Sequence, residues 1–222
     1  MRLIFIRHGQ TPANVLGLLD TAHPGPGLTE LGTTQAAAIP DALDGQGVDA
    51  LFASTLVRTQ LTAQPLAAAR GLGVTVLGGL HEIEAGALEG RGDLPSVRTY
   101  LETVFAWGSG DLDARMPGGP DGHDFFGRYN GDLESIARSG VDSAAVVSHG
   151  AAIRVWVAAH ATNVAPTFAA ENHLDNTGIV VLDGSFDDGW SLARWADQPI
   201  GGAVLADASA EDPTGELLSE AD

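Results

Sequence analysis

The chain has 222 residues, a formal net charge of −18 at pH 7 and a hydrophobic content of 44%. This length suits one sizeable domain, and the composition is that of a globular protein. So acidic a surface disfavours nucleic acid and anionic membranes as partners. The absence of cysteine excludes disulfides, thiolate catalysis and cysteine-based metal centres, and no apolar run is long enough to predict a transmembrane helix.

Apolar runs with strand character alternate with helical patterns along most of the chain. The expected strands cover residues 2–6, 48–54, 74–80, 142–150, 178–184 and 190–196. The expected helices cover residues 28–43, 55–71, 95–107, 125–138 and 151–161. Residues 11–26 are rich in turn formers, with room for one helical turn. Because strands and helices alternate, the sequence predicts a three-layer α/β/α fold with a mostly parallel central sheet.

No break in composition divides the chain convincingly. We expect a single catalytic domain over residues 1–200 and an acidic, mobile tail over residues 201–222, where aromatic residues are absent. The short apolar run at the N-terminus carries no secretory pattern, so a cytoplasmic location is expected. The oligomeric state stays open, with a homodimer as one alternative.

Two histidines stand at the ends of strand-like runs, His8 in "RLIFIRHG" and His149 in "AAVVSHGAA". Ligands of α/β sheets bind beyond the carboxyl ends of the strands, so Arg7 and both histidines are expected in one crevice. Gly9 and Gly150 would let the backbone turn sharply and approach a ligand. A lone histidine at a strand end is more often structural, but a matched pair beside an arginine favours a site.

Five sequence segments, which include both histidines, together resemble a known protein family. "RHGQTPAN", "LTELGTTQA", "FASTLVRTQLTA", "LHEIEAGALEG" and "VVSHGAAIR" follow one another across residues 3–154. Together they resemble the histidine phosphatase superfamily in its phosphoglycerate-mutase-like branch. The tripeptide RHG alone is a weak signal, whereas five blocks in order are specific. The resemblance implies a phosphoglycerate-mutase-like fold.

The resemblance also implies catalytic roles. His8 would be the nucleophile that becomes a phosphohistidine. Arg7 and Arg58 would bind the phosphate oxygens, and His149 would donate to them. Glu82, in "HEIEAG", stands where the family carries its proton donor. The substrate-binding residues implied in the same way are Arg7, Thr11, Asn14, Arg58, His149 and Gly150.

These residue types suit phosphoryl transfer, which needs positioning and stabilisation of charge on the phosphate oxygens. Two arginines and a histidine supply that charge without a metal or cofactor. The attacking imidazole must be neutral, so its other nitrogen should donate to a backbone carbonyl near Gly9. A carboxylic acid can protonate the leaving oxygen and later activate water. The sequence therefore predicts a metal-independent phosphomonoesterase acting on a small phosphorylated metabolite.

Two other functions stay open. A cofactor-dependent phosphoglycerate mutase shares these residues, but the region after Glu82 is short and has no lysine or paired basic stretch for a second acidic group. A non-catalytic binder of a phosphorylated ligand would have no need of the acid. A metal site is disfavoured because no His-x-x-x-His pattern or aspartate cluster is present.

Several further residues are secondary candidates. Glu84 and Glu89 are alternatives to Glu82 as the acid, and His23 and His173 are candidate substrate contacts. We expect His81 and Arg154 to be structural, the arginine in an ion pair. Family members commonly carry Gly-Glu-Ser where this chain has Gly119-Pro120-Asp121, which leaves Asp121, His123 or Asp124 to substitute.

Overall fold

Residues 1–215 are described by the computed structural model, and their strands form one six-stranded sheet in the order β3-β2-β4-β1-β5-β6. The strands are β1 (Arg2–Arg7), β2 (Ala50–Ser54), β3 (Val74–Leu77), β4 (Ser143–Ser148), β5 (Ile179–Ser185) and β6 (Gly189–Ala196). The α-helices are α1 (Pro12–Val15), α2 (Glu30–Ala42), α3 (Val57–Arg70), α4 (Leu94–Gly108), α5 (Gly122–Arg138), α6 (Gly150–His160) and α7 (Phe168–Glu171).

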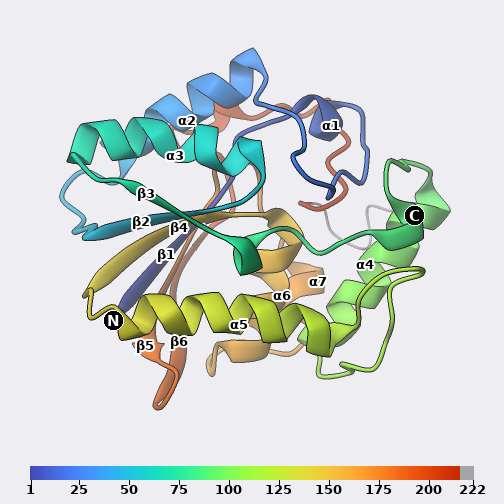
Figure 1. The fold of residues 1–222 in the computed structure, drawn as a ribbon. Helices are drawn as coiled ribbons and strands as arrows, with labels where there is room; N and C mark the ends of the chain where they lie inside the picture. Colours follow the sequence, from blue (N-terminus) through green and yellow to red (C-terminus); the bar gives the residue numbers. More distant parts are fainter. Residues whose placement is uncertain (216–222) are drawn as a thin grey trace.

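The sheet is mostly parallel, as predicted. β1 pairs in parallel with β4, and β2 pairs in parallel with both β4 and β3. Only the β1–β5 and β5–β6 pairs within residues 1–215 are antiparallel. Helices α2 and α3 cover one face of the sheet, and α4, α5, α6 and α7 lie on the other (Figure 1). The predicted three-layer α/β/α fold is therefore confirmed.

Strand β1 lies inside the sheet and is buried from solvent because helices cover both of its faces. Leu3, Ile4, Phe5 and Ile6 are all fully buried. Leu3 and Phe5 pack into the cluster beneath the α4–α6 layer, whereas Ile4 and Ile6 pack into the cluster beneath α2 and α3. A strand buried on both faces needs a continuous apolar run, which explains the opening sequence. Burial of each such side chain contributes about 1.5–3 kcal/mol to folding.

The expected elements are present, with shifts at their ends. The strand expected over 74–80 ends at Leu77, where a short 3₁₀ turn over Gly78–Leu80 begins. Helix α7 and that 3₁₀ turn are additions to the prediction. The loop over 11–26 contains α1, which begins with a capping box between Thr11 and Asn14.

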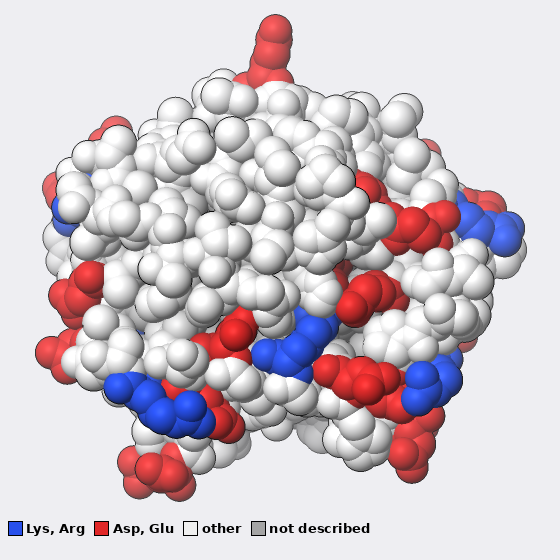
Figure 2. All heavy atoms as spheres, in the orientation of Figure 1, with Lys and Arg blue, Asp and Glu red and all other residues white. Residues whose placement is uncertain are grey.

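Charged side chains are unevenly distributed on the face seen in Figure 2. They gather over its lower half, around α5, whereas a broad uncharged area covers α2 and α3. Among residues 1–215, no helix is both long and apolar enough to span a bilayer.

The segment expected to form a tail lies partly in the described range. Residues 201–215 pass alongside α2 and reach α1 (Figure 1), where Gln35 donates to the carbonyl of Leu205 at 2.8 Å. Residues 216–222 lie outside the described range. The domain boundary at residue 200 and the mobility of the tail stay predictions.

Gly32, in the first turn of α2, allows the loop after His8 to pass close to this helix. A Cβ at Gly32 would lie 2.1 Å from the carbonyl oxygen of Gln10, which is backbone and cannot move aside cheaply. We expect Gly32→Ala to lower the free energy of unfolding by about 1–3 kcal/mol. The matched control is Gly127→Ala, in the exposed middle of α5 with open space around it, which should stabilise the protein by up to about 1 kcal/mol. Urea denaturation of both variants measures the effect, and equal shifts would contradict the steric explanation.

Candidate active site

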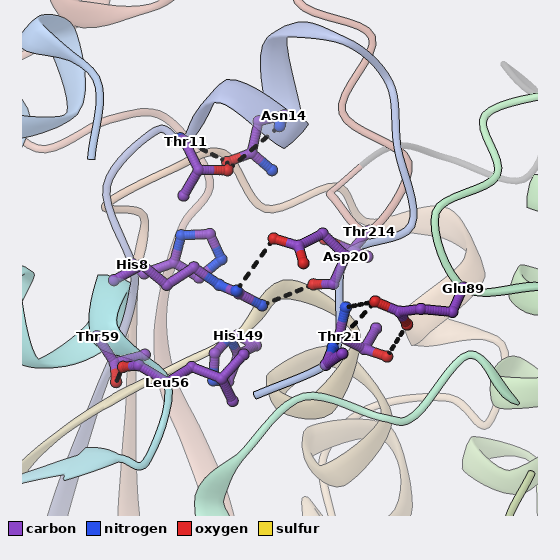
Figure 3. A network of polar contacts seen from close by, with 12 residues as sticks. His8, Thr11, Asn14, Asp20, Thr21, Leu56, Thr59, Glu89, His149 and Thr214 are labelled. Carbon is purple, nitrogen blue, oxygen red and sulfur yellow. Dashed lines mark hydrogen bonds and ion pairs between the residues drawn. The ribbon is translucent and has the colours of Figure 1, made fainter. Parts of the chain in front are cut away.

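The two histidines meet because β1 and β4 are neighbours in register. Arg7 pairs with Ser148 across the two strands, and the His8 backbone N–H donates to the Ser148 carbonyl at 3.0 Å. The rings of His8 and His149 lie edge to face with centroids 5.2 Å apart. Both histidines are buried, and they lie together in the close view of Figure 3. The expected convergence at the strand ends is present.

The imidazole of His8 is fixed in one tautomer. Its Nδ1 lies 2.8 Å from the carbonyl oxygen of Gly9, and because a carbonyl only accepts, the proton sits on Nδ1. Nε2 therefore keeps a free lone pair. Burial, then the charges of Arg58 and Arg7, hold the pKa of His8 well below its usual range. A nucleophilic histidine was expected to be neutral and to donate from its other nitrogen to a carbonyl near Gly9, and His8 has both properties.

A loop before β5 holds the backbone of His8. The Asn176 side-chain amide donates to the His8 carbonyl at 3.1 Å, and the Thr177 N–H donates to the carbonyls of Arg7 and His8 at 3.1 and 3.3 Å. Thr177 has φ of +59°, a left-handed conformation uncommon for a β-branched residue. The sequence analysis singled out neither residue, although Asn176 ends the "ENHLDN" segment that contains His173 and Thr177 directly follows it.

Arg58 projects from the first turn of α3 and is buried. Its Nη2 donates to the Asp20 carbonyl oxygen at 2.8 Å, and Nη1 lies 3.4 Å from the Asp20 carboxylate. Burial lowers the pKa of Arg58 from its ordinary value, and Asp20 opposes that shift. Its Nε has no partner among residues 1–215, so this buried cation keeps a donor for an anion.

Arg7 is completely buried and more heavily engaged. Nη1 donates to the Leu174 carbonyl at 2.6 Å and lies 2.5 Å from Asp212 Oδ2. Nη2 donates to Asp212 Oδ1 at 2.7 Å and to the Thr214 hydroxyl at 3.0 Å. Burial acts to lower the pKa of Arg7, but the Asp212 carboxylate, together with Glu82 and Asp175, outweighs it, so the pKa is raised. Asp212 and Thr214 come from the very end of the described chain and were not predicted.

His149 is oriented by Ser54 at the end of β2. The hydroxyl of Ser54 lies 2.8 Å from His149 Nε2 and 3.0 Å from the hydroxyl of Thr59. Burial, then Arg58 and His8, hold the pKa of His149 well below its usual range. Nδ1 of His149 has no partner among residues 1–215. Ser54 and Thr59 sit in the "FASTLVRT" block, which was the available sequence signal.

Glu82 lies buried at the N-terminus of α6. Its carboxylate accepts from the backbone N–H groups of Ile83, Ala152 and Ala151 at 3.0, 2.9 and 3.2 Å. Burial raises the pKa of Glu82, although these N–H groups and the two site arginines oppose the shift. A buried carboxyl with a raised pKa is suited to donate a proton near neutral pH.

The other two glutamates are engaged elsewhere. Glu84 pairs with Arg128 at 3.0 Å and with His81 at 3.0 Å. Glu89 accepts from the backbone N–H and the hydroxyl of Thr21 at 2.9 and 2.5 Å. Burial lowers the pKa of His81 to about 3, which keeps that ring neutral. These contacts favour Glu82 as the acid.

Thr11 and Asn14 stand beside the histidines in Figure 3. The Asn14 side-chain oxygen accepts from the Thr11 N–H at 2.9 Å, which leaves its Nδ2 to donate to Asp212 Oδ1 at 2.9 Å. Gly150 begins α6, and a Cβ there would lie 2.7 Å from the Thr214 carbonyl oxygen. A close backbone approach therefore explains this glycine.

Arg154 makes contacts different from the expected ion pair. Its guanidinium donates to the backbone carbonyls of Ala169 at 2.7 Å and Thr214 at 3.0 Å and lies 4.7 Å from the centroid of the Phe105 ring. Among residues 1–215, no carboxylate lies within ion-pair distance of Arg154, and burial lowers its pKa to about 9. Backbone carbonyls and an aromatic ring thus surround the positive charge of Arg154, in place of a carboxylate.

The remaining candidates have local partners. His23 is exposed, bonds to Thr55 and stacks near His81 with centroids 5.2 Å apart. His173 Nε2 lies 3.4 Å from Asp197. Their roles as substrate contacts stay predictions.

The segment that departs from the family pattern has an evident structural role. Asp121 caps α5 in a reciprocal capping box with Asp124 and also pairs with Arg115. His123 lies 3.1 Å from Asp113. Any contact of these residues with substrate stays a prediction. Within residues 1–215, no three His, Asp or Glu side chains are grouped closely enough to hold a metal ion.

Two curated proteins are similar in sequence to this chain. The chain is 39% identical over 223 residues to the "PE-PGRS family protein PE_PGRS11" of Mycobacterium tuberculosis, covering 92% of this chain but only 38% of that relative's length. It is 27% identical to the "Probable phosphoglycerate mutase GpmB" of Salmonella paratyphi B, over 96% of this chain and 98% of the relative.

Among solved structures, a mycobacterial glucosyl-3-phosphoglycerate phosphatase in complex with VO3 superimposes with a TM-score of 0.75 at 26% identity, covering 89% of this chain and 99% of that one. The family model of the histidine phosphatase superfamily (branch 1) matches residues 3–198. The paired histidines, the two buried arginines and the enclosed glutamate thus lie in a protein that belongs to the histidine phosphatase superfamily.

Proposed function

We propose that this enzyme is a metal-independent phosphomonoesterase that hydrolyses a small phosphorylated metabolite through a phosphohistidine at His8. One observation carries the proposal: a neutral imidazole, held by Gly9, lies close enough to two buried arginines for both charges to lower its pKa. Three further buried polar atoms have no partner within residues 1–215, namely Nε of Arg7, Nε of Arg58 and Nδ1 of His149. Such an arrangement suits a tetrahedral anion beside a nucleophile.

The reaction takes place in two displacements. Nε2 of His8 attacks phosphorus, the bond from phosphorus to the leaving oxygen breaks, and the proton of Glu82 neutralises that oxygen. The bond from Nδ1–H to the Gly9 carbonyl stabilises the charge that the ring acquires. The Glu82 carboxylate then removes a proton from water, which attacks phosphorus and breaks the N–P bond. Phosphate leaves, and both side chains return to their starting states.

The similar proteins include both a phosphatase, which transfers the phosphoryl group to water, and a probable mutase, which transfers it to another hydroxyl. A phosphatase is among the solved structures and a probable mutase among the curated relatives. In a mutase the phosphoryl group would return to a second hydroxyl in place of water. The absence of lysine and the shortness of the region after Glu82 support hydrolysis.

Turnover of p-nitrophenyl phosphate with and without EDTA tests the proposal. We expect hydrolysis that EDTA leaves unchanged. Activity only on 3-phosphoglycerate, and only after priming with 2,3-bisphosphoglycerate, would assign a mutase. Thermal stabilisation by phosphate without turnover of any ester would assign a binding protein.

A further inference from the structure

Asp212 binds the face of Arg7 that a phosphate would use. Both carboxylate oxygens are engaged, Oδ2 at 2.5 Å from Nη1 and Oδ1 at 2.7 Å from Nη2. Arginine grips carboxylates and phosphates with the same planar fork. A phosphate that used both Nη atoms would therefore have to take the place of this carboxylate.

The same carboxylate reaches a second phosphate-binding candidate. Asp212 Oδ1 also accepts from Asn14 Nδ2 at 2.9 Å. One oxygen thus bridges Arg7 and Asn14, as a phosphate oxygen would if both residues were its ligands. By contrast, Arg58 has no such close pair, because the nearest carboxylate oxygen, from Asp20, lies 3.4 Å away.

Polar contacts hold the surrounding segment, residues 207–215, which we name the C-terminal strap. Gln10 Nε2 donates to Asp207 at 2.9 Å, and the Leu174 N–H donates to the Gly215 carbonyl at 3.1 Å. The Thr214 hydroxyl accepts a hydrogen bond from Arg7, and the Thr214 carbonyl accepts one from Arg154. Figure 3 shows Thr214 among the residues of the histidine site.

The strap is bound to the rest of the protein mainly by polar contacts, for which a ligand can compete. These are hydrogen bonds and one bidentate ion pair, and only two of its side chains, Pro213 and Thr214, are buried. Segments with few buried apolar contacts open at a lower free-energy cost than the core does. A phosphate dianion carries more charge and more acceptor atoms than the Asp212 carboxylate, so it can displace the strap when it is present in excess.

We propose that the C-terminal strap is an autoinhibitory element whose Asp212 carboxylate occupies the phosphate position on Arg7 and Asn14, so that substrate binds only as the strap is displaced. This inference rests on the proposed function for the identity of the phosphate site. If the strap is closed in most molecules, the apparent dissociation constant of phosphate is raised by the ratio of closed to open forms. Opening the strap should then lower KM and leave kcat unchanged, because none of the groups that react lies in the strap.

Asp212→Asn tests the inference, since it removes the charge and keeps the size. Its matched control is Glu211→Gln, the same change of charge at the exposed neighbouring position. Two measurements are made on the full chain: the Kd of inorganic phosphate by titration calorimetry, and KM and kcat for p-nitrophenyl phosphate. We expect Asp212→Asn to bind phosphate about tenfold more tightly, which corresponds to about 1.4 kcal/mol. KM should fall by the same factor with kcat within twofold of wild type, and Glu211→Gln should match wild type.

Two results would overturn the inference. Weaker phosphate binding or a higher KM in Asp212→Asn would mean that the carboxylate positions Arg7 for substrate. Equal phosphate affinity in wild type and both variants would mean that the strap does not compete at all. Failure of the proposed function is seen separately, because the calorimetric arm requires no turnover: tighter phosphate binding in Asp212→Asn without hydrolysis by any variant would retain the strap and reject the phosphatase.

Discussion

We expect the His8→Ala variant to lose turnover by more than about 10³-fold, the largest effect of any single substitution in this protein. Without Nε2 there is no atom to accept the phosphoryl group, and the surrounding cations can only bind phosphate. Phosphate affinity should fall far less than turnover does, since Arg7, Arg58 and His149 remain. Rapid acid-free quenching of wild type with substrate should trap a phosphohistidine that is missing in the variant.

A matched control separates chemistry from folding. His160→Gln changes a histidine at the far end of α6, where the ring stacks on Trp156, and should keep wild-type turnover. A His8→Ala variant that retained more than about 1% of wild-type turnover would remove His8 from the role of nucleophile.

Glu82→Gln should lower kcat by about 10²–10⁴-fold, the range typical of general acid–base catalysis. The amide keeps the shape of the side chain at the N-terminus of α6 but has no acidic proton to give. The loss should be greater for an alkyl phosphate than for p-nitrophenyl phosphate, because nitrophenolate leaves without protonation. The half-exposed neighbour Glu84 provides the matched control, Glu84→Gln, which should be close to wild type on both esters.

The pH profile gives an independent readout of Glu82. Because burial raises its pKa above the ordinary value, the acid form persists to a higher pH than a solvated glutamate allows. The first displacement needs that acid form, so its rate should fall as pH rises through the raised pKa. In Glu82→Gln this alkaline limb should be lost. An unchanged alkaline limb in the variant, or equal losses on the alkyl and aryl esters, would assign the proton to another group.

The sheet and the histidines could be predicted because their signals are local. A strand buried on both faces, such as Leu3–Ile6, must be continuously apolar, and the position of His8 at its end follows from the chain itself. The donor bond from His8 to Gly9 was predictable because it spans one residue and the chemistry demands it.

The rest of the site depends on contacts between residues that are distant in sequence. Asp212 contacts Arg7 although the two are 205 positions apart in the sequence. The acidic segment around Asp212 has the composition of a solvent-exposed tail, and no pattern in it distinguishes Asp212 from its neighbours. Asn176 and Thr177 act through a backbone conformation that no periodicity encodes. Arg154 follows the helical pattern of α6, but only the folded chain reveals that carbonyls, not a carboxylate, accept hydrogen bonds from its guanidinium.

The central place of β1 separates the site into parts that open under different conditions. Amide protons of β1, which is bonded to β4 on one side and β5 on the other, can exchange with deuterium only when the sheet itself unfolds. We expect those of the C-terminal strap to exchange faster, through the local opening proposed above, which would leave the sheet intact. We therefore expect His8 and the peptide bonds that orient it to be as durable as the whole fold, and the proposed opening of the C-terminal strap to expose Arg7 without unfolding the sheet. The proposed nucleophile would then stay fixed on the sheet while access to it changed with the strap, and hydrogen exchange of the two segments would separate these two motions.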